Sequence, residues 1–239
     1  MKKLRKSVLV LVLLISVTVF AHAGGYSQFL NNGFQALFYH SIRIEETFPS
    51  LDPIGASIEE FEKAVREGTA VGEAQLMLGM LHQYLGQSMR ALHYYSEFAK
   101  AYPEEEWVYS LIGDLYADMG RNDLALESYQ NAVAESEFAR AYLGIGKLAY
   151  EQGDYEQARE ALDKALVDTP EFLEARVALG KTLYKMEEYD EAIEVLEIAQ
   201  LQNPRSSEIH YYLALSYEAS GRHEQANHAF ERVSELTAP

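Results

Sequence analysis

Small residues recur along the chain at an almost constant interval, and this feature constrains the fold more than any other. The intervals are 34, 33, 34 and 34 residues, between Gly79, Gly113, Gly146, Gly180 and Ala214. Twelve residues after each comes an alanine, and four residues later a large apolar residue. A single repeat of this length cannot bury its own apolar face, so the pattern predicts a solenoid of stacked units.

Each unit reads as two helices joined by a tight turn. Apolar residues follow a helical period, as at Leu78, Leu81 and Leu85. Seven residues after the first small residue comes a glycine, which can take a positive φ and end the first helix. Only the fourth unit departs, with Glu187 in that place. The side chains predicted to cap the second helices are those of Ser88, Asn122 and Asp154.

The third unit resembles the tetratricopeptide repeat in its Ala139–Tyr142 stretch, its Gly146, its Gly153-Asp154-Tyr155 turn and its Pro170. The same register recurs five times, and we divide the sequence into units 72–105, 106–138, 139–172, 173–206 and 207–239. This resemblance implies an all-α fold: a right-handed α-solenoid of stacked antiparallel helix pairs, the tetratricopeptide superhelix.

Residues 24–71 precede the regular repeats. A helical period of apolar residues, a turn bracketed by Pro49 and Pro53, and a Ser57–Glu60 capping box predict an N-terminal helical cap or degenerate repeat. The aromatic residues of 26–48 leave a second interpretation open, in which this segment is a surface for a partner or for dimerisation.

The first 23 residues have the pattern of a signal peptide. A basic start is followed by an apolar run from Val8 to Phe20 and by an Ala21-His22-Ala23 site. The sequence therefore predicts an exported protein, periplasmic or extracellular after cleavage. It would be attached to a membrane only if the signal sequence is retained as an anchor, and the run is short for a stable membrane span.

Composition argues against several functions. A net charge of −17 disfavours nucleic acid, and the absence of cysteine excludes thiolate metal sites and a cysteine nucleophile. His223 and His228 are five residues apart, one too many for a zinc pair on one helix face. No motif for catalysis or for a phosphate cradle occurs, so we expect no enzyme activity, no cofactor and no metal.

The family resemblance implies that the first helices line a groove, with unit positions 2, 5, 9, 12 and 13 facing it. These positions give one predicted partner-binding set: Leu76, Met80, Tyr84, Trp107, Arg140, Lys147, Lys181 and Lys185. The first four are mostly apolar and the last four are cationic, which suggests a partner segment with an apolar part and an acidic part. Alternatively, Lys147 and Lys181 simply pair with neighbouring acids such as Glu151.

These features predict a non-catalytic scaffold or adaptor that binds a peptide or helix of a partner protein. Resemblance to exported bacterial repeat proteins suggests a role in assembling an envelope or secretion complex. The two-carboxylate clamp of some family members is absent, because its lysine position is occupied by Leu76, Ser110, Leu143, Val177 and Tyr211. The alternative is a self-associating structural spacer without a peptide ligand, that is, a homo-oligomer.

Overall fold

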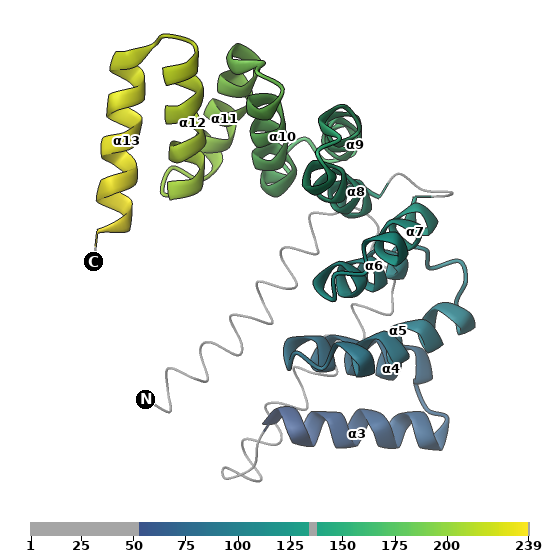
Figure 1. Ribbon diagram of the computed structural model, residues 1–239. Coiled ribbons are helices and arrows are strands. Elements are labelled where there is room, and N and C mark those ends of the chain that lie inside the picture. The colour runs from purple at the N-terminus through teal and green to yellow at the C-terminus, as the bar shows by residue number, and fades with distance from the viewer. Residues whose placement is uncertain (1–52, 134–137, 239) are drawn as a thin grey trace. The chain divides into compact units, whose positions relative to one another are not determined.

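The computed structural model describes residues 53–133 and 138–238, and all the regular secondary structure in these ranges is helical. Figure 1 shows the eleven helices of this part of the chain, α3 to α13. The predicted all-α solenoid class is therefore confirmed. The predicted signal peptide 1–23 and the aromatic segment 26–48 lie outside the described residues. None of the described helices is long and apolar enough to cross a bilayer.

The helices form two compact units, divided between residues 136 and 137. The described part of unit 1 has five helices: α3 (Pro53–Glu67), α4 (Val71–Tyr84), α5 (Ser88–Ala101), α6 (Val108–Asp118) and α7 (Asn122–Ala132). The most extensive contacts join α4 to α5 and α6 to α7, so each pair is a helix hairpin. The hairpins stack through α5 and α6, while α3 covers α4.

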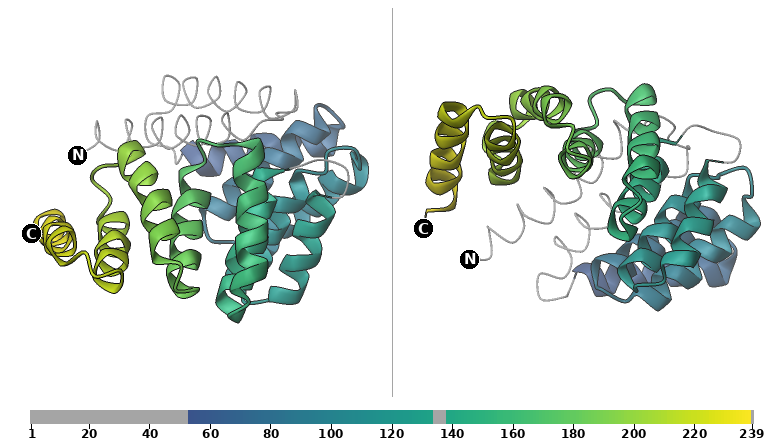
Figure 2. Two further views of the ribbon diagram at one scale, coloured as in Figure 1. Left: turned by 90° about the horizontal axis from the view of Figure 1, so that it is seen from above. Right: turned by 45° about the horizontal axis from the view of Figure 1, so that its top comes forward.

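The described part of unit 2 has six helices: α8 (Ala139–Gln152), α9 (Tyr155–Asp168), α10 (Leu173–Lys185), α11 (Tyr189–Gln202), α12 (Ser207–Ala219) and α13 (His223–Thr237). They form three hairpins that follow one another along the unit, as the two views of Figure 2 show. The first helices α8, α10 and α12 also contact one another in that order. This row of first helices positions the candidate site.

The repeating small residues allow the two helices of a hairpin to approach closely. A Cβ atom added to Gly79 would lie 2.3 Å from the ring of Tyr95, sixteen residues later in the partner helix. The same contact joins Gly146 to Leu162, at 2.6 Å. The columns recognised in the sequence are therefore the two sides of one helix–helix contact, repeated along the chain.

The turns inside the hairpins follow the glycine column. Gly153 has a φ of 80°, as expected, and Glu187 adopts a φ of 64° in the equivalent place of the next unit. A residue other than glycine in this region is uncommon and costs conformational energy. The repeat geometry thus imposes the turn even where the sequence lacks its preferred residue.

Two of the three predicted helix caps are wrong. Asp154 does cap α9, since its Oδ1 accepts a hydrogen bond from the Gln157 N–H at 3.0 Å. In α5 and α7 the N-cap residues are instead Gln87 and Arg121, and neither makes a side-chain cap bond. The N-cap is the residue directly after the glycine, which places Ser88 and Asn122 one position too late.

The predicted capping box at Ser57–Glu60 is also wrong. The helix α3 already begins at Pro53, so Ser57 lies inside it and cannot be its N-cap. The Ser57 side chain is buried. Proline is well tolerated in the first turn of a helix, where its missing N–H has no intrahelical partner. Whether residues 24–71 form a degenerate repeat stays a prediction, since only α3 of that segment is described.

Candidate functional site

A cleft of about 510 Å³ lies in unit 2 along its row of first helices. Helices α8, α9, α10 and α12 and the connection from α11 to α12 supply its lining: Gly146, Lys147, Tyr150, Glu151, Leu162, Leu173, Glu174, Val177, Ala178, Lys181, Thr182, Asn203, Ser206, Glu208 and Ile209. The volume lies within the range of ordinary ligand pockets. The cleft brings Lys147 and Lys181 together, as their equivalent positions in adjacent units predicted.

Lys181 is held in place by the next helix. Its Nζ atom donates a hydrogen bond to Glu208 Oε1 at 2.8 Å, and the same atom lies 5.2 Å from the centre of the Tyr212 ring. A carboxylate and an aromatic face together stabilise the ammonium group. The alternative raised by the sequence, an internal ion pair, therefore holds for Lys181.

Lys147 has a different environment although it lines the same cleft. Its side chain is exposed, and it makes no ion pair with any carboxylate of the described residues, Glu151 included. The predicted pairing with Glu151 is therefore wrong for this lysine. Its ammonium group is available to a ligand in the cleft.

The charge of the cleft differs from the cationic groove that the sequence suggested. Its lining contains two lysines and three glutamates, and apolar side chains such as Leu162, Val177 and Ile209. Arg140 and Lys185 do not line it. The cleft is thus a mixed-charge surface with an apolar part.

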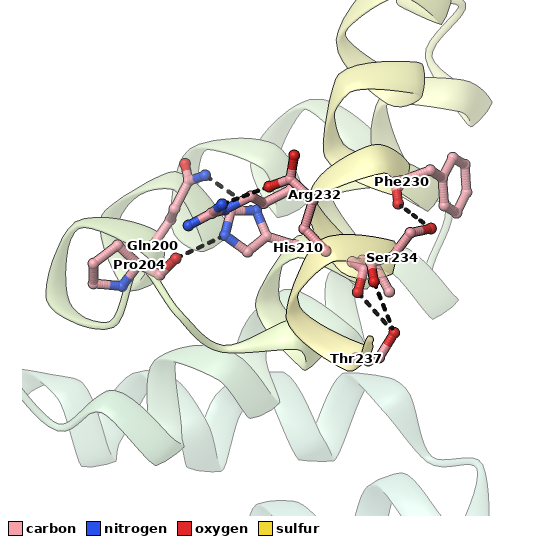
Figure 3. A network of polar contacts seen from close by, with 9 residues as sticks. Gln200, Pro204, His210, Phe230, Arg232, Ser234 and Thr237 are labelled. Atoms are coloured by element: carbon pink, nitrogen blue, oxygen red, sulfur yellow. Dashed lines mark hydrogen bonds and ion pairs between the residues drawn. The ribbon is translucent and has the colours of Figure 1, made fainter. Parts of the chain in front are cut away.

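One side of the cleft is fixed by a buried histidine. His210, in α12, is 4% exposed, and its Nε2 lies 3.0 Å from the Pro204 carbonyl oxygen. Because a carbonyl can only accept, Nε2 carries the proton, and Nδ1 accepts from Gln200 Nε2 at 3.3 Å. Figure 3 shows these contacts linking α12 to the end of α11 and the following turn. They hold the connection that places Asn203 and Ser206 on the cleft.

Tyr150 supplies an aromatic side chain to the cleft. Burial, and after it the nearby Tyr212 and Tyr155 hydroxyls, which disfavour a phenolate, together raise the pKa of its hydroxyl to about 12. The ring of Tyr150 also contacts that of Tyr155, with centroids 5.5 Å apart. Tyr150 is therefore a neutral hydrogen-bonding group at all ordinary pH values.

The predicted site residues of unit 1 have a different placement. Leu76 has no exposed surface, and Trp107 is 8% exposed and packs against Phe98 with centroids 6.1 Å apart. Met80 is partly exposed, and Tyr84 is 57% exposed at the end of α4. In this structure Leu76 and Trp107 pack the interior of unit 1, and only Met80 and Tyr84 offer substantial surface. Binding of a partner by any of the four stays a prediction.

Sequence reasoning missed several residues of the cleft. Three of them lie at groove positions of their units: Tyr150 at position 12, and Glu174 and Glu208 each at position 2. The repeat register alone would have predicted that these three face the groove. Asn203 and Ser206 come from the connection between two units. No signal in the sequence marks these two, since their place depends on how α11 and α12 pack.

The repeats, the hairpin geometry and the row of first helices define the class of protein. Three models of the tetratricopeptide repeat match the chain, at residues 149–215, at residues 110–171, and at residues 73–105 together with 208–236. The chain belongs to the tetratricopeptide repeat family. The members of this family typically act as scaffolds for interactions between proteins.

Solved structures of the same fold resemble this chain. One crystal structure of the MamA protein is 25% identical, with a TM-score of 0.60, and the match covers 69% of this chain and 91% of that one. YrrB, described as a TPR protein with an unusual peptide-binding site, is 19% identical, with a TM-score of 0.61 over 75% of this chain and 93% of its own. At that identity the YrrB match shows the fold alone. No curated protein shows significant similarity to the chain.

Proposed function

We propose that this protein is an exported, non-catalytic scaffold that binds a segment of a partner protein in the cleft of unit 2, and so helps to assemble an envelope or secretion complex. The cleft carries the proposal. It combines apolar side chains with Lys147, which forms no ion pair within residues 53–133 and 138–238. An apolar contact flanked by a charged group suits the recognition of an exposed peptide segment.

The peptide-binding site described for YrrB supports the proposal by analogy of fold. Export rests on the pattern of residues 1–23. The alternative is a self-associating spacer. In that alternative, two copies of the chain would contact each other through exposed aromatic side chains. The candidates are the exposed Tyr84 and the aromatic segment 26–48.

Site-specific photocrosslinking in the native cell tests the binding function. The photoreactive residue p-benzoylphenylalanine replaces Glu174, which is exposed and lines the cleft. A control chain carries it in place of Lys164, which is exposed on α9 and does not line the cleft. We expect a covalent adduct with a different protein from position 174 and none from position 164.

Other outcomes contradict the proposal in distinct ways. Equal adducts from both positions would place binding elsewhere on the surface. Adducts containing only a second copy of the chain would favour the spacer. N-terminal sequencing of the protein from the extracytoplasmic fraction tests export, and a first residue of Gly24 is expected.

A further inference from the structure

The cleft contains two sets of residues at equivalent positions of consecutive repeats. Adding 34 to the numbers of Lys147, Tyr150 and Glu174 gives Lys181, Tyr184 and Glu208. In the second set the lysine and the glutamate form the 2.8 Å ion pair. In the first set the corresponding pair is not made, although Lys147 and Glu174 line the same cleft.

One aromatic residue distinguishes the surroundings of the two sets. In the second set the aromatic ring of Tyr212 contacts the lysine and the tyrosine. Lys181 Nζ is 5.2 Å from its centre, and the Tyr184 ring meets it edge-on with centroids 6.1 Å apart. In the first set the equivalent residue is Ala178, which has no ring.

We propose that the cleft binds a partner segment through an aromatic side chain that takes, above Ala178, the place that Tyr212 occupies in the next repeat. This inference rests on the proposed function and names the chemistry of its partner. Lys147 would then lie over the ligand ring and Tyr150 would meet its edge. Glu174 would close the ion pair with Lys147, as Glu208 does with Lys181.

The chemistry of the lining fits an aromatic guest. A ring gains contact with apolar side chains, here Val177 and Leu162, and its face attracts an ammonium group. Lys147 is exposed and forms no ion pair in the part of the chain that the structure describes, so a guest does not have to break such a pair to reach it. The cleft volume of about 510 Å³ accommodates one aromatic side chain with adjoining backbone.

Small probes test the inference without knowledge of the partner. N-acetyl-tyrosinamide, N-acetyl-phenylalaninamide and N-acetyl-leucinamide are titrated into the ¹⁵N-labelled protein, and the amide shifts of Gly146, Val177 and Lys181 are followed by NMR. We expect the two aromatic probes to bind roughly two- to fivefold tighter than the leucine probe, the factor that a cation–π contact supplies. Equal affinities, or no saturable shift at these amides, would overturn the inference.

Two variants make the test specific to the proposed position. Ala178→Tyr supplies the ring from the chain itself and is expected to abolish the shifts, while circular dichroism confirms that the fold is kept. Lys147→Met is expected to remove the preference for aromatic probes and to leave the leucine probe unaffected. If Ala178→Tyr bound the aromatic probes as well as the natural chain does, the guest would not sit above residue 178.

Failure of this inference and failure of the proposed function give different results. A heterologous crosslink from position 174 together with no preference for aromatic probes would keep the function and reject the aromatic guest. Self-crosslinks alone would reject the function, whatever the probes show.

Discussion

Units 1 and 2 use the same repeat columns with different residues, and the difference determines what each can offer a partner. In the two hairpins of unit 1 the residue that covers the small column is tyrosine, and in the first two hairpins of unit 2 it is leucine. The hydroxyl of Tyr95 donates to Gln83 Oε1 at 2.9 Å, and that of Tyr129 to Asp114 Oδ1 at 2.8 Å. Unit 1 therefore ties polar residues of its first helices to its own second helices.

In unit 2 the covering residues Leu162 and Leu196 cannot make such bonds. Polar residues of its first helices, among them Lys147 and Glu174, line an open cleft instead. The comparison teaches that the register of a repeat fixes where a side chain lies, while the identity of its packing partner decides whether that side chain is available.

The largest effect is expected from removing a covering side chain. Tyr95 and Leu162 are both fully buried. Tyr95→Ala should lower the free energy of unfolding by about 3–5 kcal/mol, and Leu162→Ala by somewhat less within about 2–5 kcal/mol, because the tyrosine loses a hydrogen bond as well as its packing. Urea unfolding followed by circular dichroism measures both. If Leu162→Ala lost more free energy of unfolding than Tyr95→Ala, the covering leucine of unit 2 would stabilise the fold more than the covering tyrosine of unit 1.

A smaller effect is expected from adding a methyl group to the small column. Gly79→Ala would bring a Cβ against the rigid Tyr95 ring, whereas Gly146→Ala meets the more flexible Leu162 side chain. We expect a cost of about 1–3 kcal/mol for Gly79→Ala and a smaller one for Gly146→Ala, where the helix propensity of alanine offsets part of the strain.

A double variant checks the cause of that difference. Tyr95→Leu should reduce the cost of Gly79→Ala when the two are combined, since leucine moves away from the new methyl group more easily than a ring does. Additive costs in the double-mutant cycle would show that the ring is not the source of the strain.

The hydroxyl groups of the two units predict a dependence on alkaline pH. Burial, and after it the 2.6 Å hydrogen bond to Glu197, together raise the pKa of Tyr217 in unit 2 to about 12. A raised tyrosine pKa gives stability that is complete below the usual tyrosine pKa of 10.0 and is lost as pH rises through about 12.

The stability of Tyr217→Phe should therefore fall less steeply than that of the natural chain between pH 10.0 and about pH 12. The control is Tyr95→Phe in unit 1, where the acceptor is the uncharged Gln83. Thermal unfolding at a series of alkaline pH values measures both. An unchanged pH slope in Tyr217→Phe would remove this residue from the alkaline transition.

The smallest effect is expected from the two cleft lysines. Lys181→Met loses a partly exposed ion pair and a cation–π contact, at a cost of about 1 kcal/mol or less. Lys147→Met loses neither and should stay within about 0.5 kcal/mol of the natural chain. Urea unfolding at low and at high salt measures the stability of both variants. A salt-dependent loss in Lys147→Met would reveal an ion pair in solution and close the difference between the two lysines.

Much of the fold was predictable from the sequence because it depends on local patterns. The period of the small residues gave the helix hairpins, and the glycines gave the turns. The caps at Ser88 and Asn122 were wrong by one residue, since polar side chains near a turn do not specify which of them precedes the helix. The positive φ of Glu187 was not expected, because the packing of the hairpin overrides the preference of that residue.

The candidate site was predictable in part. The repeat register placed Lys147 and Lys181 side by side on one surface, and the structure brings them to one cleft. It also gave Leu76 and Trp107 groove positions, yet both are buried in unit 1. Position within a repeat predicts direction, but burial depends on which helices cover that surface.

The sequence by itself determined the repeat length, the helix pairs and the contact between each small residue and its covering residue, since all of these arise from spacing within one chain segment. Only the tertiary structure decided that Lys181 is paired and Lys147 is open. In the structure Lys181 of α10 contacts Glu208 and the Tyr212 ring of α12, whereas the counterpart of Tyr212 beside Lys147 is Ala178. Such contacts exist only when the two helices are packed, because Lys181 is far from both Glu208 and Tyr212 in the sequence.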